Sequence, residues 1–310
     1  MKKSVFTKFA LTAGATLALV AGQSFAAPSA FTVNQAAIGG SFQGPALVTG
    51  TQFSGNASEL LRFSAGDTVG TVNSGFLRFS SIFNQSTSSA VSLNASSFAG
   101  QYGMYALFDF TATYNAVLSG VFAPGQAGSQ YDISALNFRF FADKLGDTTF
   151  VNANATTGTE ANRSGAFGDD VLLAFGSLLS TANPDIAGFS TAGGAFENSL
   201  TSFAICTGAN TAKIGGANVG GTAASGDACA SNMGINYFAQ PVPFYPLAFD
   251  AFNNTGNSLS SRVGNNLAVE QSVGAVSFQG NAVPEPSSIA LVGIATLALS
   301  LSGRRRRKSE

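Results

Sequence analysis

The stretch Met104–Tyr114 reads MYALFDFTATY and guides the interpretation of the whole chain. Every second position carries an apolar side chain: Met104, Ala106, Phe108, Phe110, Ala112 and Tyr114. The polar residues Asp109, Thr111 and Thr113 stand between them. Because successive side chains of a β-strand point to opposite faces, this pattern predicts a long strand with one buried face.

The same period of two recurs on both sides of this stretch. In a second predicted strand, Leu136, Phe138 and Phe140 face inward and Asn137 and Arg139 face outward. Further candidate strands cover residues 75–83, 196–205, 235–239, 247–252 and 267–278. The apolar run 171–179 fits either a buried strand or a short helix. Turns rich in glycine and asparagine separate these segments.

Many short strands with such turns predict an all-β fold, an antiparallel β-sandwich or jelly-roll-like body. The chain contains 28 phenylalanines, and at alternating positions we expect them to fill the core rather than to form a ligand platform. No linker interrupts residues 27–282, which we expect to form one exported β domain. A signal helix (1–26) precedes this domain, and a sorting tail with a short transmembrane helix (283–310) follows it.

The N-terminus has the three parts of a secretory signal peptide. Lysines within the first eight residues precede an apolar run over residues 9–21, and Ser24-Phe25-Ala26 supplies a small-residue cleavage site. We expect signal peptidase to cut before Ala27. The alternative, a permanent N-terminal helix, is disfavoured because the apolar run is too short to span a bilayer.

The C-terminus carries a short apolar segment between a proline motif and a basic end. Pro284, Glu285 and Pro286 stop any preceding strand, since proline lacks a backbone donor. The apolar residues 289–301 would cover roughly 20 Å as a helix, less than the ~30 Å core of a bilayer. The basic stop consists of Arg304, Arg305, Arg306, Arg307 and Lys308. It should stay on the cytoplasmic side, with the domain outside.

The exported domain is acidic. The whole chain has a formal charge of −1, but eight of its 15 basic residues lie in the two ends. Residues 27–282 keep seven basic and fourteen acidic side chains, and seven minus fourteen gives −7. This charge argues against binding to the phosphates of nucleic acid. It is compatible with divalent cations or with a neutral polysaccharide.

Cys206 and Cys229 are the two cysteines of the chain. In an oxidising compartment we expect them to form a disulfide, worth about 3 kcal/mol. A reactive or metal-binding thiol pair is the alternative. The glycine-rich loop that they enclose, residues 207–228, is expected to be the least structured part of the domain.

Catalytic signatures are missing from the sequence. The chain has no histidine, which excludes Ser-His-Asp and Cys-His nucleophiles and His-ligated zinc. We therefore expect no enzymatic activity and no cofactor. A polysaccharide-cleaving pair of carboxylates is the alternative, and its candidates are Asp143, Asp147, Asp169, Asp170 and Asp250. Such loop aspartates also serve as ordinary turn residues.

Two acidic loops suggest calcium. Asp143 and Asp147 flank Lys144-Leu145-Gly146, and Asp169 and Asp170 follow Gly168. Hard oxygen ligands of this kind suit Ca²⁺, although no EF-hand spacing is present. A further candidate is the segment Pro241–Pro246, which reads PVPFYP. It fits a crossover at the edge of a sheet, or an exposed aromatic patch that stacks on sugars or docks a partner.

The C-terminal arrangement resembles the PEP-CTERM sorting signal, on Pro284-Glu285-Pro286, the apolar segment and the basic end in that order. The resemblance implies a Gram-negative bacterium in which exosortase, a membrane-embedded cysteine transpeptidase, recognises the motif and removes the tail. The inner membrane would then hold the protein only transiently, before it reaches the cell surface or extracellular space.

The domain is also similar to the flocculation-associated PEP-CTERM proteins over residues 98–278. The residues that carry this similarity are 102–108, 146–150, 169–174, 243–249 and 252–256. The family implies retention of cells and exopolysaccharide in flocs, without a known catalytic activity. Our first hypothesis is thus a matrix protein that promotes flocculation or biofilm through exopolysaccharide. The alternatives are a carbohydrate-binding module with a defined sugar site and a secreted polysaccharide-active enzyme.

Overall fold

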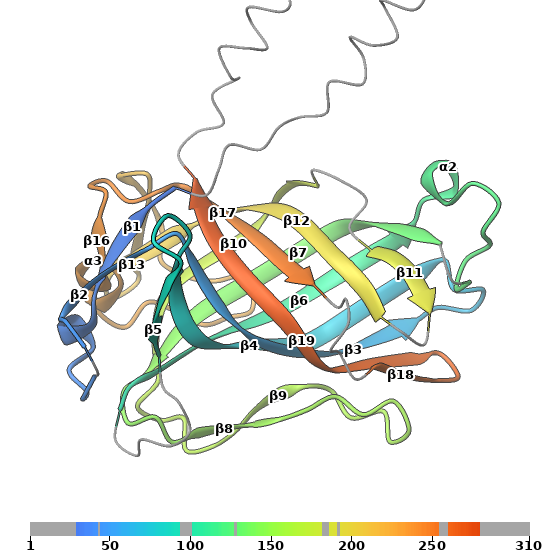
Figure 1. The fold of residues 1–310 in the computed structure, drawn as a ribbon, viewed down its shortest axis with the longest axis horizontal. Coiled ribbons are helices and arrows are strands. Elements are labelled where there is room, and N and C mark those ends of the chain that lie inside the picture. Colours follow the sequence, from blue (N-terminus) through green and yellow to red (C-terminus); the bar gives the residue numbers. More distant parts are fainter. Residues whose placement is uncertain are drawn as a thin grey trace, which may run out of the picture. The chain divides into compact units, whose positions relative to one another are not determined.

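The computed structural model describes residues 29–42, 44–93, 101–126, 129–181, 186–190, 193–253 and 260–279 (Figure 1). The chain divides into two compact units, one spanning Pro28–Asn281 and the other made of Met1–Ala27 and Ala282–Glu310. The predicted signal helix and C-terminal transmembrane helix lie outside the described residues. Among the residues that are described, no helix is long and apolar enough to cross a membrane.

Antiparallel strands form almost all of the first unit. The largest sheet contains β3 (Gln52–Phe63), β4 (Val69–Asn84), β5 (Ser89–Ser92), β6 (Gly103–Tyr114), β7 (Gln130–Asp143), β10 (Val171–Thr181), β11 (Ile186–Ser190), β12 (Gly193–Ser202), β13 (Ala204–Gly208), β14 (Thr211–Ile214), β15 (Ala217–Gly220), β17 (Leu247–Asn253), β18 (Ser260–Val263) and β19 (Asn266–Gln279). A second sheet contains β1 (Phe31–Asn34), β2 (Leu47–Gly50) and β16 (Phe238–Gln240). Strands β8 (Thr148–Val151) and β9 (Asn162–Gly165) pair with each other as a separate two-stranded sheet. The helices are short: η1 (Gln35–Ile38), α2 (Ala116–Ser119) and α3 (Met233–Tyr237).

The large sheet closes on itself. Strand β10 pairs with β7, and it also pairs with β12, where Leu178 lies opposite Thr201. A ring of hydrogen-bonded neighbours therefore forms, in the order β12, β17, β19, β3, β4, β6, β7, β10 and back to β12. The predicted antiparallel all-β fold is confirmed. The pairing order adds that one curled sheet, rather than two stacked sheets, surrounds the core (Figure 1).

Phenylalanines fill the interior of the ring, as predicted. Phe79 lies between Phe53 and Phe140, with ring centroids 5.4 Å and 4.7 Å away. Phe31 of β1 and Phe238 of β16 also pack on Phe53, at 5.1 Å and 6.5 Å. The three-stranded sheet therefore covers part of the same apolar interior. Each fully buried phenylalanine stabilises the fold by about 1.5–3 kcal/mol.

The face predicted to be polar carries a second apolar cluster. Tyr105, Leu107 and Phe141 point away from the interior of the ring and are nevertheless buried. The β8–β9 hairpin covers part of this cluster, since Phe150 packs against Phe76 at 4.7 Å and against Tyr105 at 5.2 Å, and Arg163 lies over Phe141. The inward set on β6 and β7 is confirmed, but both faces of these strands are buried in part.

Two local expectations were wrong. Residues 207–228 are not the least structured part of the body, because they contain β14 and β15. Gly215 and Gly216 join these strands with φ of 53° and 90°, the two positive angles that a tight two-residue hairpin turn requires. The predicted strand 235–239 is largely helix α3. The run 171–179, left open between strand and helix, is strand β10.

Candidate functional site

The connection between β7 and β8 is organised by Asp143. This residue ends β7, and its buried carboxylate accepts hydrogen bonds from the backbone N–H groups of Gly146 and Thr148, at 2.7 Å and 3.0 Å. A carboxylate that bonds backbone groups a few residues ahead stabilises a turn. Asp143 therefore has a structural role in holding residues 144–148.

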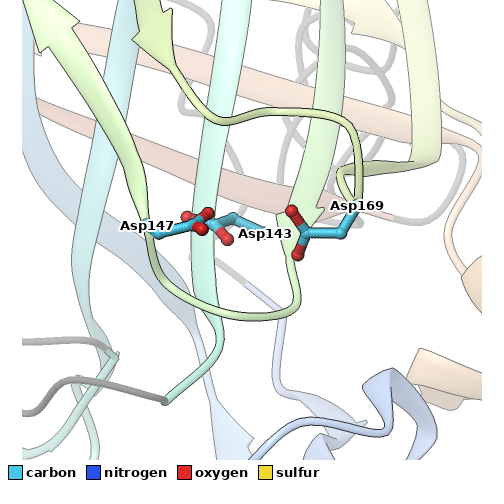
Figure 2. Close-up of side chains that lie close together, drawn as sticks. All are labelled: Asp143, Asp147 and Asp169. Atoms are coloured by element: carbon cyan, nitrogen blue, oxygen red, sulfur yellow. The ribbon is translucent and has the colours of Figure 1, made fainter.

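Asp143, Asp147 and Asp169 lie together (Figure 2), with one carboxylate oxygen of each within 4.8 Å of the others. Asp147 is exposed and Asp169 is half-buried. Asp169 also accepts a hydrogen bond of 3.0 Å from the backbone N–H of Leu145, which ties the two acidic loops together. Three of the four predicted calcium ligands thus share one place in the fold. Oxygen ligands so arranged suit a hard cation, and calcium binding stays a prediction.

Asp170, the fourth predicted ligand, lies in a different network. Its carboxylate accepts hydrogen bonds from the hydroxyl of Tyr105 and from Thr148 Oγ1, and Arg163 is 3.6 Å away. The side chain is only 1% exposed. Burial raises the pKa of Asp170 to about 6. Asp169 lies in the turn before β10 and bonds Leu145, whereas Asp170, directly before the first residue of β10, reaches Tyr105 and Arg163.

Arg163 completes this network. Its guanidinium lies over the rings of Phe141 and Phe167, at 4.7 Å and 4.8 Å from their centroids. It also donates a hydrogen bond of 2.7 Å to the hydroxyl of Tyr105. A buried acidic group is stable only with such partners, and the pair of Arg163 on β9 and Asp170 before β10 supplies them.

The polysaccharide-cleaving alternative needs two carboxylates that a substrate can reach. Both oxygens of Asp143 accept backbone hydrogen bonds, and Asp170 is sealed from solvent. Asp250 lies on β17, but its side chain is outside the described part of the chain. Asp147 and Asp169 remain accessible, so the structure does not test the polysaccharide-cleaving alternative.

Cys206 and Cys229 form the predicted disulfide, with Cα atoms 5.3 Å apart. Both cysteines are buried. The loop before Cys229 is held on the outside of the ring, because Asp227 forms an ion pair with Arg139 and Ser225 donates a hydrogen bond of 3.1 Å to Asp109.

The segment Pro241–Pro246 does not present an aromatic patch. Phe244 is 6% exposed and packs on Phe238 and Phe278, at 4.9 Å and 5.1 Å between ring centroids. The hydroxyl of Tyr245 donates a hydrogen bond of 2.8 Å to the carbonyl of Ala30. Both aromatic side chains serve the fold, which corrects the sugar-stacking alternative for this segment.

Comparison with protein families identifies a known motif in one part of the chain. Residues 282–307 match the PEP-CTERM protein-sorting motif. The motif implies an exported protein that passes through the membrane and is processed by exosortase. It contains Pro284, Glu285 and Pro286, and it includes the first part of the predicted basic stop, Arg304–Arg307. All of these residues lie outside the described part of the structure.

The match to the PEP-CTERM motif does not extend into the β domain. The comparisons with curated proteins and with solved structures gave no match. The likeness of the domain to flocculation-associated proteins therefore stays a prediction.

The structure also reveals groups that the sequence did not single out. Arg78 lies opposite Asn56 across β3 and β4, and both line a groove that reaches Asp147. Glu59 is buried in the ring without a hydrogen-bond partner for Oε2 among the described residues. The surroundings of these side chains depend on the register between strands, which no local sequence pattern records.

Proposed function

We propose that the protein is a non-enzymatic component of the cell surface or extracellular matrix. It promotes cell aggregation, as in flocculation or biofilm, by associating with exopolysaccharide. The observation that carries the proposal is the PEP-CTERM motif at residues 282–307. A tail that delivers a protein to exosortase suits a body that acts outside the inner membrane.

The features of the β body support a scaffold rather than a catalyst. Each strand of the ring is paired on both sides, so the ring has no free edge. The disulfide also restrains the β14–β15 hairpin, which lies between its two cysteines. A rigid body can offer several weak contacts at once to a polymer, and such multivalent contacts add up to firm attachment. Calcium held by Asp143, Asp147 and Asp169 could bridge to acidic groups of the polymer.

The side chains also support the absence of catalysis. The chain has no histidine to act as a general base near neutral pH. Asp170 has a raised pKa, as catalytic acids often have. Its side chain is 1% exposed, however, and is bonded to neighbouring residues, so a substrate has no access to it.

The sorting step is tested by replacing Glu285 with alanine in the full-length protein. We expect this variant to keep its tail and to remain in the inner-membrane fraction, because exosortase no longer recognises it. The matched control is Ser287→Ala, next to the motif, which we expect to be processed as the wild type. Cell fractionation and the mass of the C-terminal peptide report the outcome. Normal cleavage and release of the Glu285 variant would contradict the sorting role.

The aggregation role is tested by deleting the gene in the producing strain. We expect the deletion strain to settle more slowly and to retain less exopolysaccharide, and the intact gene to restore both properties. A deletion strain that flocculates normally would refute this part of the proposal while leaving export and sorting in place.

A further inference from the structure

A groove of about 630 Å³ lies on the outer face of the ring, beside strand β8. Its lining includes Asn56, Phe76, Arg78, Asp147, Phe150 and Asn152. The residues come from β3, β4 and the segment that contains β8, so the groove forms where the β8–β9 cover meets the bare outer surface. Its volume falls in the usual range of small-molecule sites, about 300–1,000 Å³.

Arg78 differs from the other arginines of the body. Four arginines lie within 4.0 Å of a carboxylate, in the pairs Arg62–Glu160, Arg139–Asp227, Arg163–Asp170 and Arg262–Asp67. Within the described part of the chain, the side chain of Arg78 has no ion pair and no hydrogen bond. Among the described side chains it has no carboxylate partner, although the domain has twice as many acidic as basic residues.

The guanidinium of Arg78 is nevertheless held in place. It lies over the ring of Phe150, 5.8 Å from the centroid, and Phe150 is itself packed against Phe76 and Tyr105. Stacking on an aromatic ring restrains a guanidinium and leaves its N–H groups available. The groove therefore presents a positioned cation with unused donors.

The other polar groups of the groove suit hydroxyl groups. Asn56 stands opposite Arg78 in the strand register, and Asn56, Asp147 and Asn152 are exposed. Among the described residues, no hydrogen bond occupies the side chains of Asn56 and Asn152. A carboxamide both donates and accepts, and a carboxylate accepts. Sugar hydroxyls, which also do both, match this set.

We propose that this groove binds a saccharide that carries a carboxylate, that is, a uronic acid residue of a polysaccharide. The carboxylate pairs with the guanidinium of Arg78, whose fork of N–H groups matches its two oxygens. Asn56, Asn152 and Asp147 bond the hydroxyls. The inference rests on the proposed function and identifies the site and the class of sugar.

The experiment measures binding of tri-galacturonic acid to the exported protein by calorimetry. Its methyl ester serves as a second probe, since it keeps the hydroxyls and lacks the charge. Arg78→Gln removes the cation, and Arg62→Gln is the matched control, an arginine of the neighbouring strand β3 that pairs with Glu160 outside the groove. Circular dichroism checks that each variant is folded.

We expect the wild type to bind the acid, and Arg78→Gln to weaken binding about tenfold or more, as the loss of a charge-assisted pair predicts. The ester should bind the wild type as weakly as the acid binds the Arg78 variant. Arg62→Gln should stay within about twofold of the wild type.

The results separate the site from the function. Equal binding of the acid by wild type and Arg78→Gln overturns the site, and equal binding of acid and ester overturns the ligand class. If the wild type binds the strain's own exopolysaccharide but not the acid, the uronate inference fails and the proposed function stands. If it binds neither, both fail.

Discussion

Replacing Glu59 by glutamine should make the protein more stable above neutral pH. Glu59 shares the inner face of β3 with Ala57 and Leu61, both of which belong to the apolar interior of the ring. It is buried, and its Oε2 atom has no hydrogen-bond partner among the described residues. Burial therefore raises the pKa of Glu59 from 4.5 to about 7.

The direction of the pH effect follows from proton binding. The unfolded chain loses the Glu59 proton near pH 4.5, whereas the folded protein keeps it up to about pH 7. Between these values the unfolded state binds fewer protons, so the free energy of unfolding falls as the pH rises. Each pH unit is worth about 1.4 kcal/mol, which gives a loss of about 3 kcal/mol. Glutamine stays neutral and avoids this loss.

The assay is urea unfolding of the exported protein, followed by circular dichroism at several pH values between about 4.5 and 8.5. We expect Glu59→Gln and the wild type to unfold with similar free energies at the acidic end. The variant should be more stable by about 3 kcal/mol at the alkaline end.

The control for this series is Glu160→Gln, which removes a solvent-accessible partner of Arg62. It should change the free energy of unfolding by less than about 1 kcal/mol throughout. A difference between Glu59→Gln and the wild type that does not change with pH would refute the reasoning.

Three other predictions concern stability and metal binding. Replacing Cys206 and Cys229 by serine should lower the free energy of unfolding by about 3 kcal/mol, and a reductant should then have no further effect on urea unfolding. Arg163→Ala should destabilise by about 3–5 kcal/mol, because it leaves the buried carboxylate of Asp170 without its charged partner. Arg62→Ala, at an accessible ion pair, should lose less than about 1 kcal/mol, and similar losses for the two variants would contradict the structural role of Arg163. If the acidic cluster binds calcium, the ion should raise the melting temperature of the wild type and have less effect on that of Asp147→Asn. A calorimetric titration that shows no calcium binding to the wild type would refute this prediction.

Strand periodicity was readable because it is a local property. The alternation over Met104–Tyr114 correctly assigned the inward residues of β6, and Leu136, Phe138 and Phe140 did the same for β7. The outward residues Tyr105 and Phe141 were not expected to be buried. Their cover, the β8–β9 hairpin, is a separate segment whose docking no pattern within β6 or β7 records.

The acidic residues show the same division. The sequence grouped Asp143, Asp147, Asp169 and Asp170 by their glycine-flanked loops, and the structure brings the first three together. It directs Asp170 to Arg163 and Tyr105 instead, while Asp169, in the turn before β10, bonds the β7–β8 connection. The spacing of the carboxylates in the sequence cannot show this difference, since it depends on which distant segments each side chain meets in the fold.

By itself, the sequence determined the antiparallel all-β class, the sorting motif at the C-terminus and the exclusion of histidine chemistry. Each of these depends on residue type and on spacing over a few positions. Only the tertiary structure decided that the strands close into a ring and that Glu59 points into it. It also decided that Arg78 lies in a groove beside Phe150 with no ion pair to any described residue. These features arise from the register between strands that are far apart in the chain, and that register is set by packing of the whole domain.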